Sequence, residues 1–84
     1  MILGPMITPL QVKMARTALG WGVRDLAKKA ELAANTVSRF ENGSDVMIGT
    51  LSQMQKTLED AGVIFLPADE AGGPGVRLKT AGTD

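Results

Sequence analysis

Two short amphipathic segments, separated by only three residues, lie within residues 23–43. Apolar side chains recur at helical spacing in both, which predicts one helix over 23–30 and another over 34–42, joined by a turn at 31–33. Gly43 ends the second helix, because glycine readily takes the left-handed conformation that closes a helix. The side chains expected on the buried faces are Leu26, Ala27, Ala30, Val37 and Phe40. Two helices this short and this closely linked are expected to cross at roughly 90–120°.

A further helix is predicted before this pair. Thr8 and Gln11 match a capping box, and Pro9 suits the first helical position. Apolar residues recur along its expected buried face, which consists of Leu10, Met14 and Ala18, with Val12 and Ala15 beside them. Residues 1–7 are expected to form a loose arm before this helix. Trp21, the only tryptophan, is expected to fold back over the core.

A fourth helix is predicted over residues 48–61, before Gly62. Its apolar stripe consists of Ile48, Leu51, Met54, Leu58 and Ala61. The methionines at 14, 47 and 54 are expected to fill the core.

The C-terminal part of the chain has a different pattern. Residues 63–66 are apolar and β-prone, and residues 76–78 alternate apolar and charged side chains, so a β-hairpin with a long loop is expected. Two isolated strands are marginally stable in water and need cover from the helices or from a second copy. The expected fold is mainly α, with a four-helix bundle over 8–62 and a short C-terminal hairpin over 63–79 that serves as a dimerisation element. At 84 residues, the chain 1–84 is expected to form a single domain.

The composition excludes several classes of function, because the sequence contains neither cysteine nor histidine. The absence of cysteine is typical of a cytoplasmic protein and leaves no thiolate metal site. The absence of histidine removes the commonest general base, and no nucleophile–base pair can be named. We therefore expect no enzymatic activity, no metal and no cofactor. The longest apolar runs are also too short to cross a bilayer, so no membrane partner is expected.

Charge is unevenly distributed, although the formal net charge is zero. Residues 1–44 carry six Lys or Arg and three Asp or Glu, whereas residues 45–84 carry three and six. Nucleic-acid binding usually shows as a basic excess, and here the basic half contains the closely linked helices. An asymmetry of this size also arises by chance in short chains.

Over about residues 8–61, the chain resembles the Xre/Cro-type helix-turn-helix regulators, the phage-repressor-like DNA-binding domains. The resemblance is carried by Leu19-Gly20-Trp21, Leu26-Ala27, Asn35-Thr36-Val37-Ser38-Arg39-Phe40, Glu41-Asn42-Gly43 and Leu51. It implies a four-helix repressor-like bundle that binds double-stranded DNA in a sequence-specific way. It also implies a transcription regulator, in the first place a repressor, that acts as a homodimer.

The helix over 34–42 is the expected reader of the major groove. By resemblance, Ala34, Asn35 and Arg39 occupy base-reading positions, and Ser38 is placed with them because it lies on the same face. Asparagine can bond adenine N6 and N7, arginine can bond guanine O6 and N7, and the alanine methyl group can contact thymine.

The remaining site residues are expected to position the helices. Phosphate contacts are expected from Val23, Arg24, Lys28, Thr36, Asn42, Gly43 and Ser44. The first two lie at a helix N-terminus, which offers free amides and a positive dipole end. By resemblance, Arg16 and Glu41 form a salt bridge that orients the reading helix.

The sequence departs from the family pattern at three positions. Glu31 stands where the turn usually has glycine, and a left-handed glutamate costs about 1 kcal/mol. Ala33 replaces the usual Ser or Thr cap, and Val23 replaces a polar residue.

Two other functions compatible with these residues keep the same fold. The chain is also consistent with the antitoxin of a toxin–antitoxin pair, in which the apolar strand at 64–66 and the acidic C-terminal half contact a toxin. It is also consistent with a protein-interaction module that has lost DNA binding, because the departures near the reading helix permit such a loss.

Overall fold

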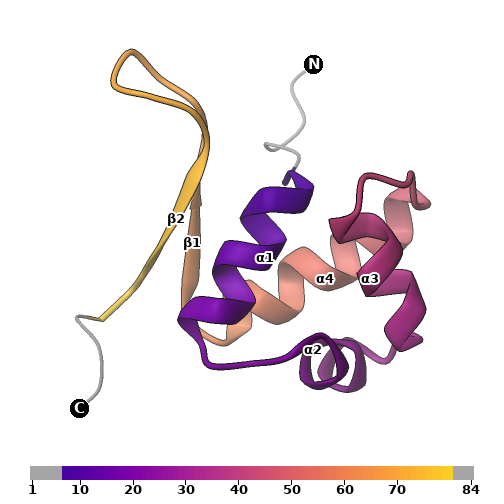
Figure 1. Cartoon of the computed structure of the whole chain (residues 1–84). Coiled ribbons are helices and arrows are strands. Elements are labelled where there is room, and N and C mark those ends of the chain that lie inside the picture. The colour runs from indigo at the N-terminus through magenta and orange to yellow at the C-terminus, as the bar shows by residue number, and fades with distance from the viewer. Residues whose placement is uncertain (1–6, 81–84) are drawn as a thin grey trace.

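The computed structural model describes residues 7–80 and contains four helices followed by a two-stranded antiparallel hairpin (Figure 1). The elements are α1 (Pro9–Ala18), α2 (Val23–Ala30), α3 (Ala34–Glu41), α4 (Ile48–Asp60), β1 (Val63–Leu66) and β2 (Gly75–Leu78). This confirms the expected fold class, and α2, α3, α4 and the two strands begin and end within one residue of their predicted boundaries. The expected loose arm falls mostly outside the described residues, but Ile7 is buried in the core, so its assignment to the arm was wrong.

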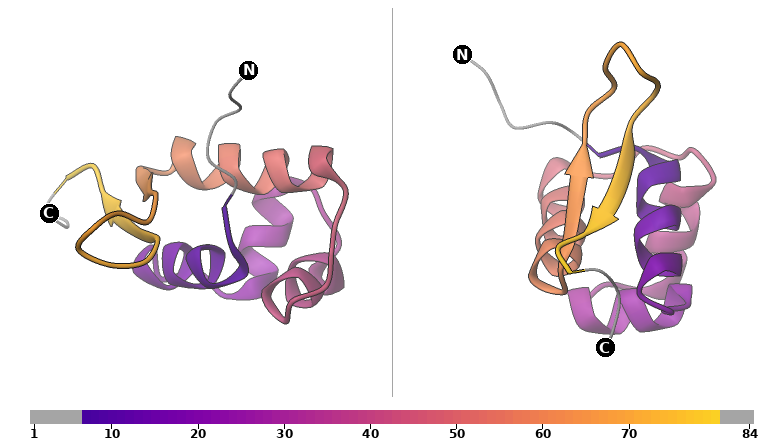
Figure 2. Two further views of the ribbon diagram at one scale, coloured as in Figure 1. Left: turned by 90° about the horizontal axis from the view of Figure 1, so that it is seen from above. Right: turned by 90° about the vertical axis from the view of Figure 1, so that its left-hand side faces the viewer.

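The hairpin lies along one side of the helical bundle, and α3 lies at the other side (Figure 1). Seen from the hairpin side, β1 runs over α4 and β2 runs over α1 (Figure 2). The strands pair from Val63 with Leu78 to Leu66 with Gly75. Phe65, Val76 and Leu78 pack against the core, so the bundle supplies the cover that an isolated hairpin lacks.

The buried face of α1 differs from the predicted one. Val12 and Ala15 are buried as expected, but Leu10 is 62% exposed and Ala18 is exposed. The hairpin packs against α1 through β2, on the face that carries Gln11 and the two buried apolar residues. Helical spacing predicts an apolar stripe, but the position of the hairpin decides which side of that stripe is covered.

The first turn of α4 is also more exposed than predicted. Leu51, Met54 and Leu58 are buried as expected, whereas Met47 is 80% and Ile48 65% exposed. Ala61, at the other end of the predicted stripe, is exposed and lies outside the helix. The neighbours that cover α4 are α2, α1 and β1.

Gln11 makes a tertiary connection that the sequence does not reveal. Its side chain completes the capping box, because Oε1 accepts from the Thr8 N–H at 2.9 Å and the Gln11 N–H donates to Thr8 Oγ1 at 3.1 Å. The same amide then donates through Nε2 to the carbonyls of Leu66 (3.1 Å) and Gly75 (2.9 Å). One buried side chain therefore caps the N-terminus of α1 and binds both strands of the hairpin.

Candidate nucleic-acid interface

The turn between α2 and α3 contains the two expected departures from ideal helix ends. Glu31 is left-handed, with φ of 60° and ψ of 43°, and the Leu32 N–H donates to the Ala27 carbonyl at 2.8 Å. Ala33 is the N-cap of α3 and supplies no side-chain cap. Both departures lie in the turn, and the close contact of the two helices is preserved because Ala27 is small and buried.

The end of α3 is held to α1 by an ion pair. Arg16 Nε donates to Glu41 Oε2 at 2.7 Å, and Arg16 Nη2 donates to Glu41 Oε1 at 2.9 Å. Arg16 Nη1 also donates to the Trp21 carbonyl at 3.3 Å. The side chains are only 16% and 7% exposed. The carboxylate raises the pKa of Arg16, so this guanidinium stays charged throughout the working pH range.

Beyond the ion pair, α3 closes with a Schellman motif. Gly43 has a φ of 100°, its N–H donates to the Phe40 carbonyl at 2.9 Å, and the Ser44 N–H donates to the Arg39 carbonyl at 2.9 Å. The Asn42 N–H is also used within the helix, since it donates to the Ser38 carbonyl at 3.0 Å. These three amides are therefore occupied. The groups at this end that remain available to a phosphate are the exposed side chains of Asn42 and Ser44.

The outer surface of α3 presents a small set of polar side chains. Asn35 and Arg39 are exposed, whereas Ala34, Thr36 and Ser38 are half-buried. Val37 and Phe40 are buried on the opposite face. The amide and the guanidinium therefore reach furthest into solvent, one helical turn apart along the same helix.

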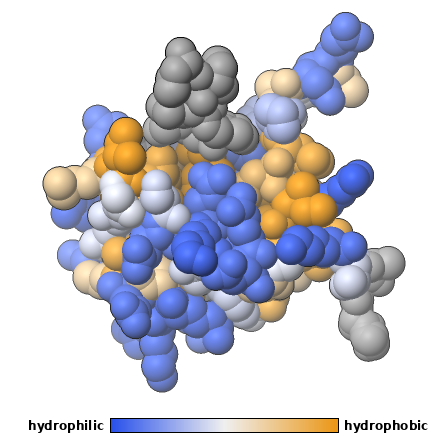
Figure 3. Space-filling view, turned by 180° about the vertical axis from the view of Figure 1, so that it is seen from behind, coloured by the Kyte–Doolittle hydropathy of each residue, from blue (hydrophilic) through white to orange (hydrophobic). Residues whose placement is uncertain are grey.

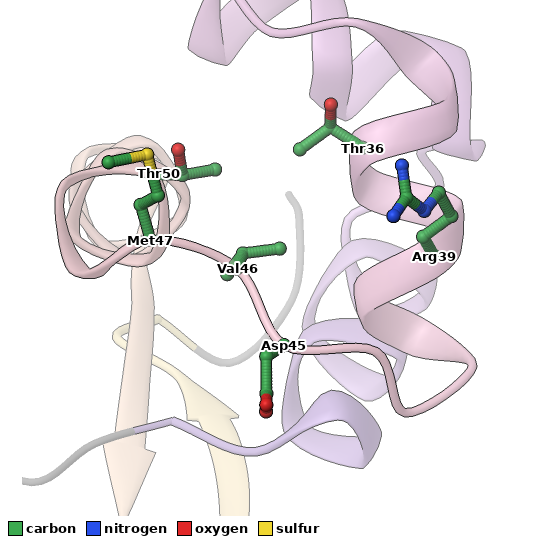
Figure 4. A pocket seen from close by; sticks show the side chains of 6 residues that line it. All are labelled: Thr36, Arg39, Asp45, Val46, Met47 and Thr50. Atoms are coloured by element: carbon green, nitrogen blue, oxygen red, sulfur yellow. The ribbon is translucent and has the colours of Figure 1, made fainter.

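Arg39 also borders a recess between α3 and the start of α4. The recess has a volume of about 160 Å³ and is lined by Thr36, Arg39, Asp45, Val46, Met47 and Thr50. In the close view, the Arg39 guanidinium extends toward Thr36, and the Asp45 carboxylate points away from it (Figure 4). The guanidinium is therefore not neutralised by its nearest acidic neighbour in this recess.

Sequence reasoning missed the contribution of α4 to this surface. The first turn of α4 has no side-chain cap, and Thr50 and Gly49 line an adjoining recess with Leu32, Met47 and Gln53. The signal was present in the sequence, because Met47 immediately precedes the predicted helix and cannot cap it. Only the tertiary structure shows that this helix end lies beside Arg39.

The N-terminus of α2, where Val23 and Arg24 are predicted to contact phosphate, also carries the acidic side chain of Asp25. The first intrahelical bond runs from the Leu26 N–H to the Gly22 carbonyl at 3.1 Å, so the amides of Val23 and Arg24 precede the hydrogen-bonded turns. Asp25 Oδ2 accepts from the Gly22 N–H at 2.7 Å. This carboxylate offsets part of the positive potential that the helix end would offer to a phosphate.

Basic side chains on α2 divide into two groups. Arg24 and Lys28 are exposed four residues apart and therefore project from the same face. Lys29 projects elsewhere, with Nζ 5.0 Å from the centre of the Trp21 ring. Trp21 packs against the core as expected. Its cation–π contact with the Lys29 ammonium was not predicted from the sequence.

The described part of the chain offers little for other kinds of site. Across residues 7–80, no group of three or more His, Cys, Asp or Glu is arranged to hold a metal ion. Over the same range, every helix is too short or too polar to cross a membrane.

A model of the helix-turn-helix family HTH_3 matches residues 12–59. The chain belongs to this helix-turn-helix family, the Xre/Cro-like group of DNA-binding regulators. The match spans all of α2 and α3 and most of α1 and α4, so it covers the ion pair, the turn and the exposed surface of α3. No curated protein matches the sequence. The helix-turn-helix assignment therefore rests on the family model together with the geometry of α2 and α3.

Proposed function

We propose that this helix-turn-helix protein is a sequence-specific transcriptional repressor that acts as a homodimer and reads the major groove with α3. The supporting observation is the pairing of an exposed amide, Asn35, with an exposed guanidinium, Arg39, on a helix tied to α1 by a bidentate ion pair. A reading helix must be held rigidly, because base recognition depends on the geometry of two parallel hydrogen bonds. The ion pair between Arg16 and Glu41 supplies that rigidity.

Specificity in this proposal comes from two long side chains and two short ones. Asn35 reads adenine, and Arg39 reads guanine, each through two hydrogen bonds in the major groove. Ala34 and Ser38 are half-buried and approach bases only where α3 lies deepest in the groove. Such a reader supports modest discrimination per subunit, and a second subunit doubles the bases that are read.

Phosphate contacts in the proposal come mainly from side chains. Arg24 and Lys28 approach one strand from α2, and Thr36 lies near the start of α3. Beyond the end of α3, Asn42 and Ser44 contribute side chains, whereas the Gly43 amide is already bonded within the Schellman motif. The Val23 amide also contacts a phosphate, but the attraction is weaker because the Asp25 carboxylate lies at the same end of α2.

The repressor is favoured over a module that has lost DNA binding by the outward position of Asn35 and Arg39. Neither side chain takes part in a side-chain hydrogen bond or salt bridge within residues 7–80. Side chains without a structural role in this region are free to bind an external partner. The antitoxin alternative keeps this DNA-binding surface and adds a toxin that contacts the apolar strand at 64–66 and the acidic C-terminal half, and co-purification with a small toxin would establish it.

The test begins with selection of bound duplexes from a random-sequence pool. Fluorescence anisotropy then measures binding of the selected duplex and of a scrambled duplex at several salt concentrations. We expect Asn35→Ala and Arg39→Ala each to weaken binding to the selected duplex by about 10- to 100-fold, with little effect on the scrambled one. Lys13→Ala, an exposed change on α1, is the matched control. Equal affinity of the native protein for both duplexes would overturn the proposal.

A further inference from the structure

The hairpin has an inner face on the bundle and an outer face that carries both apolar and basic side chains. Because side chains alternate along a strand, Ile64 and Leu66 of β1 point away from the inward Val63 and Phe65. Arg77 of β2 lies opposite Ile64 on that outer face. Seen from behind, the side of the molecule that carries the hairpin shows apolar surface beside strongly hydrophilic side chains (Figure 3).

The outer face is shallow next to Leu66. Leu66 pairs with Gly75, and a Cβ placed at Gly75 would meet no atom within 4 Å. A leucine side chain therefore stands beside an open depression on the same face. The low surface at Gly75 leaves room beside Leu66 for a side chain of an opposing copy.

Charges are separated along the length of the hairpin. The tip, which projects beyond the bundle (Figure 1), carries Asp69 and Glu70, and the base carries Arg77 and Lys79. The tip is a defined turn, because Asp69 Oδ1 accepts from the N–H groups of Ala71 (2.8 Å) and Gly72 (3.2 Å). None of these four charged side chains forms a salt bridge within residues 7–80.

The spacing of these charges matches a two-fold axis at Leu66 and Gly75. Glu70 follows Leu66 by four residues toward the tip, and Lys79 follows Gly75 by four residues toward the base. Glu70 lies beyond the end of β1 and Lys79 beyond the end of β2, so the two charges lie in opposite directions along the hairpin from this axis. Rotation by 180° therefore brings the acidic tip of one copy over the basic base of the other.

The strand edges are less suited to such an interface. The Lys79 N–H donates to the Gly62 carbonyl at 2.8 Å, which makes these two residues a hydrogen-bonded pair. Hydrogen-bonded and non-hydrogen-bonded pairs alternate along an antiparallel ladder, so the N–H and C=O groups of Val63 and Val76 point outward from the hairpin. Val63 is only 1% exposed, which closes that part of the β1 edge. Antiparallel pairing of two β2 edges centred on Arg77 or Leu78 would place Arg77 opposite Arg77 or Lys79 of the other copy, and like charges in register are destabilising.

We infer that the outer faces of two hairpins pack together about a two-fold axis that runs across both strands at Leu66 and Gly75, with the Leu66 side chains of the two copies against each other and the acidic tips over the basic bases. The occupant of this face is therefore a second copy of the chain. This inference deepens the proposed function by naming the surface through which the homodimer forms. Because α3 lies on the other side of the bundle from the hairpin (Figure 1), both reading helices stay uncovered.

Charge exchange tests the interface directly. One variant, Glu70→Lys with Ala71→Lys, makes the tip basic and keeps Asp69, which shapes the turn. The other, Arg77→Glu with Lys79→Glu, makes the base acidic. Each variant places like charges at both contacts of its own dimer, whereas a one-to-one mixture pairs a basic tip with an acidic base and an acidic tip with a basic base.

Analytical ultracentrifugation over a concentration series, without DNA, measures the association constant. A narrow hairpin face is small beside the roughly 800 Å² per partner of a standard interface, so the series must extend to high concentration. We expect the native protein to dimerise, each variant to associate at least tenfold more weakly, and the mixture to recover association as a heterodimer. Lys13→Glu with Lys28→Glu, which changes net charge as much as the second variant, should leave association unchanged.

Each result bears on the inference separately from the proposed function. A native protein that is monomeric at every concentration, or variants that associate as the native protein does, would overturn it. Circular dichroism checks folding, and Glu70→Gln, which only removes the charge, replaces any variant that unfolds and should weaken association. Loss of base discrimination with dimerisation intact would contradict the proposed function alone, because these measurements use no DNA.

Discussion

The guanidinium of Arg16 and the carboxylate of Glu41 face each other across α1 and α3 through two hydrogen bonds of 2.7 and 2.9 Å. Glu41 lies at the C-terminal end of α3, where the helix dipole disfavours a negative charge. Arg16 offsets this cost and also binds the Trp21 carbonyl, so one side chain joins the ends of two helices and the loop between α1 and α2.

Removal of one partner of this pair should destabilise the fold strongly. Glu41→Gln leaves the guanidinium partly buried without its counter-charge, and we expect a loss of about 3 kcal/mol in the free energy of unfolding, measured with urea. Lys56→Ala breaks the exposed pair between Lys56 and Asp60, and should cost at most about 0.5 kcal/mol. Similar losses for the two variants would show that the buried pair contributes no more than a surface pair.

Removal of the Gln11 amide should loosen the hairpin. Gln11→Ala leaves the carbonyls of Leu66 and Gly75 without their shared donor and also breaks the capping box, so we expect a loss of about 2–3 kcal/mol. Hydrogen exchange of this variant, compared with the native protein, should show a larger loss of protection in the hairpin than in α2 and α3. The control is Gln53→Ala, which removes a single hydrogen bond to the Ala30 carbonyl and should cost about 1 kcal/mol. Unchanged hairpin protection would contradict this role for Gln11.

Relief of the left-handed glutamate should stabilise the protein. Glu31→Gly places glycine at a φ of 60°, which glycine adopts without steric cost, and we expect a gain of about 0.5–1 kcal/mol in thermal or urea unfolding. Lys13→Gly, at an exposed position inside α1, should instead lose about 1 kcal/mol because glycine is a poor helix former. A destabilised Glu31→Gly variant would mean that the side chain contributes more than its backbone strain costs.

The salt dependence of DNA binding should separate phosphate contacts from base contacts. If Lys28 neutralises one phosphate, Lys28→Ala should reduce the slope of log K against log salt concentration by about 0.9 and weaken binding to all duplexes similarly. Lys13→Ala serves again as the control and should leave the slope unchanged. A slope that is the same for Lys28→Ala and the native protein would place Lys28 outside the phosphate contacts.

Local patterns were sufficient to predict the helices and the pairing of α2 with α3. Helical spacing identified Leu26, Ala27, Val37 and Phe40 as buried, because a short helix packed on one side buries one stripe of its surface. The capping box at Thr8 was also readable, since it depends on residues three positions apart, and the family pattern indicated the left-handed turn at Glu31. The sequence by itself therefore determined the elements, their ends and the family.

Tertiary structure alone decided how those elements cover one another. Leu10, Met47 and Ile48 continue apolar stripes yet remain exposed, because no neighbouring element within residues 7–80 covers the ends of α1 and α4 on those sides. The bond from Gln11 to Gly75 spans 64 positions, and the position of Asp45 beside Arg39 depends on the path of the chain from α3 to α4. Such contacts arise when separate elements pack together, and periodicity within one element carries no record of its neighbours.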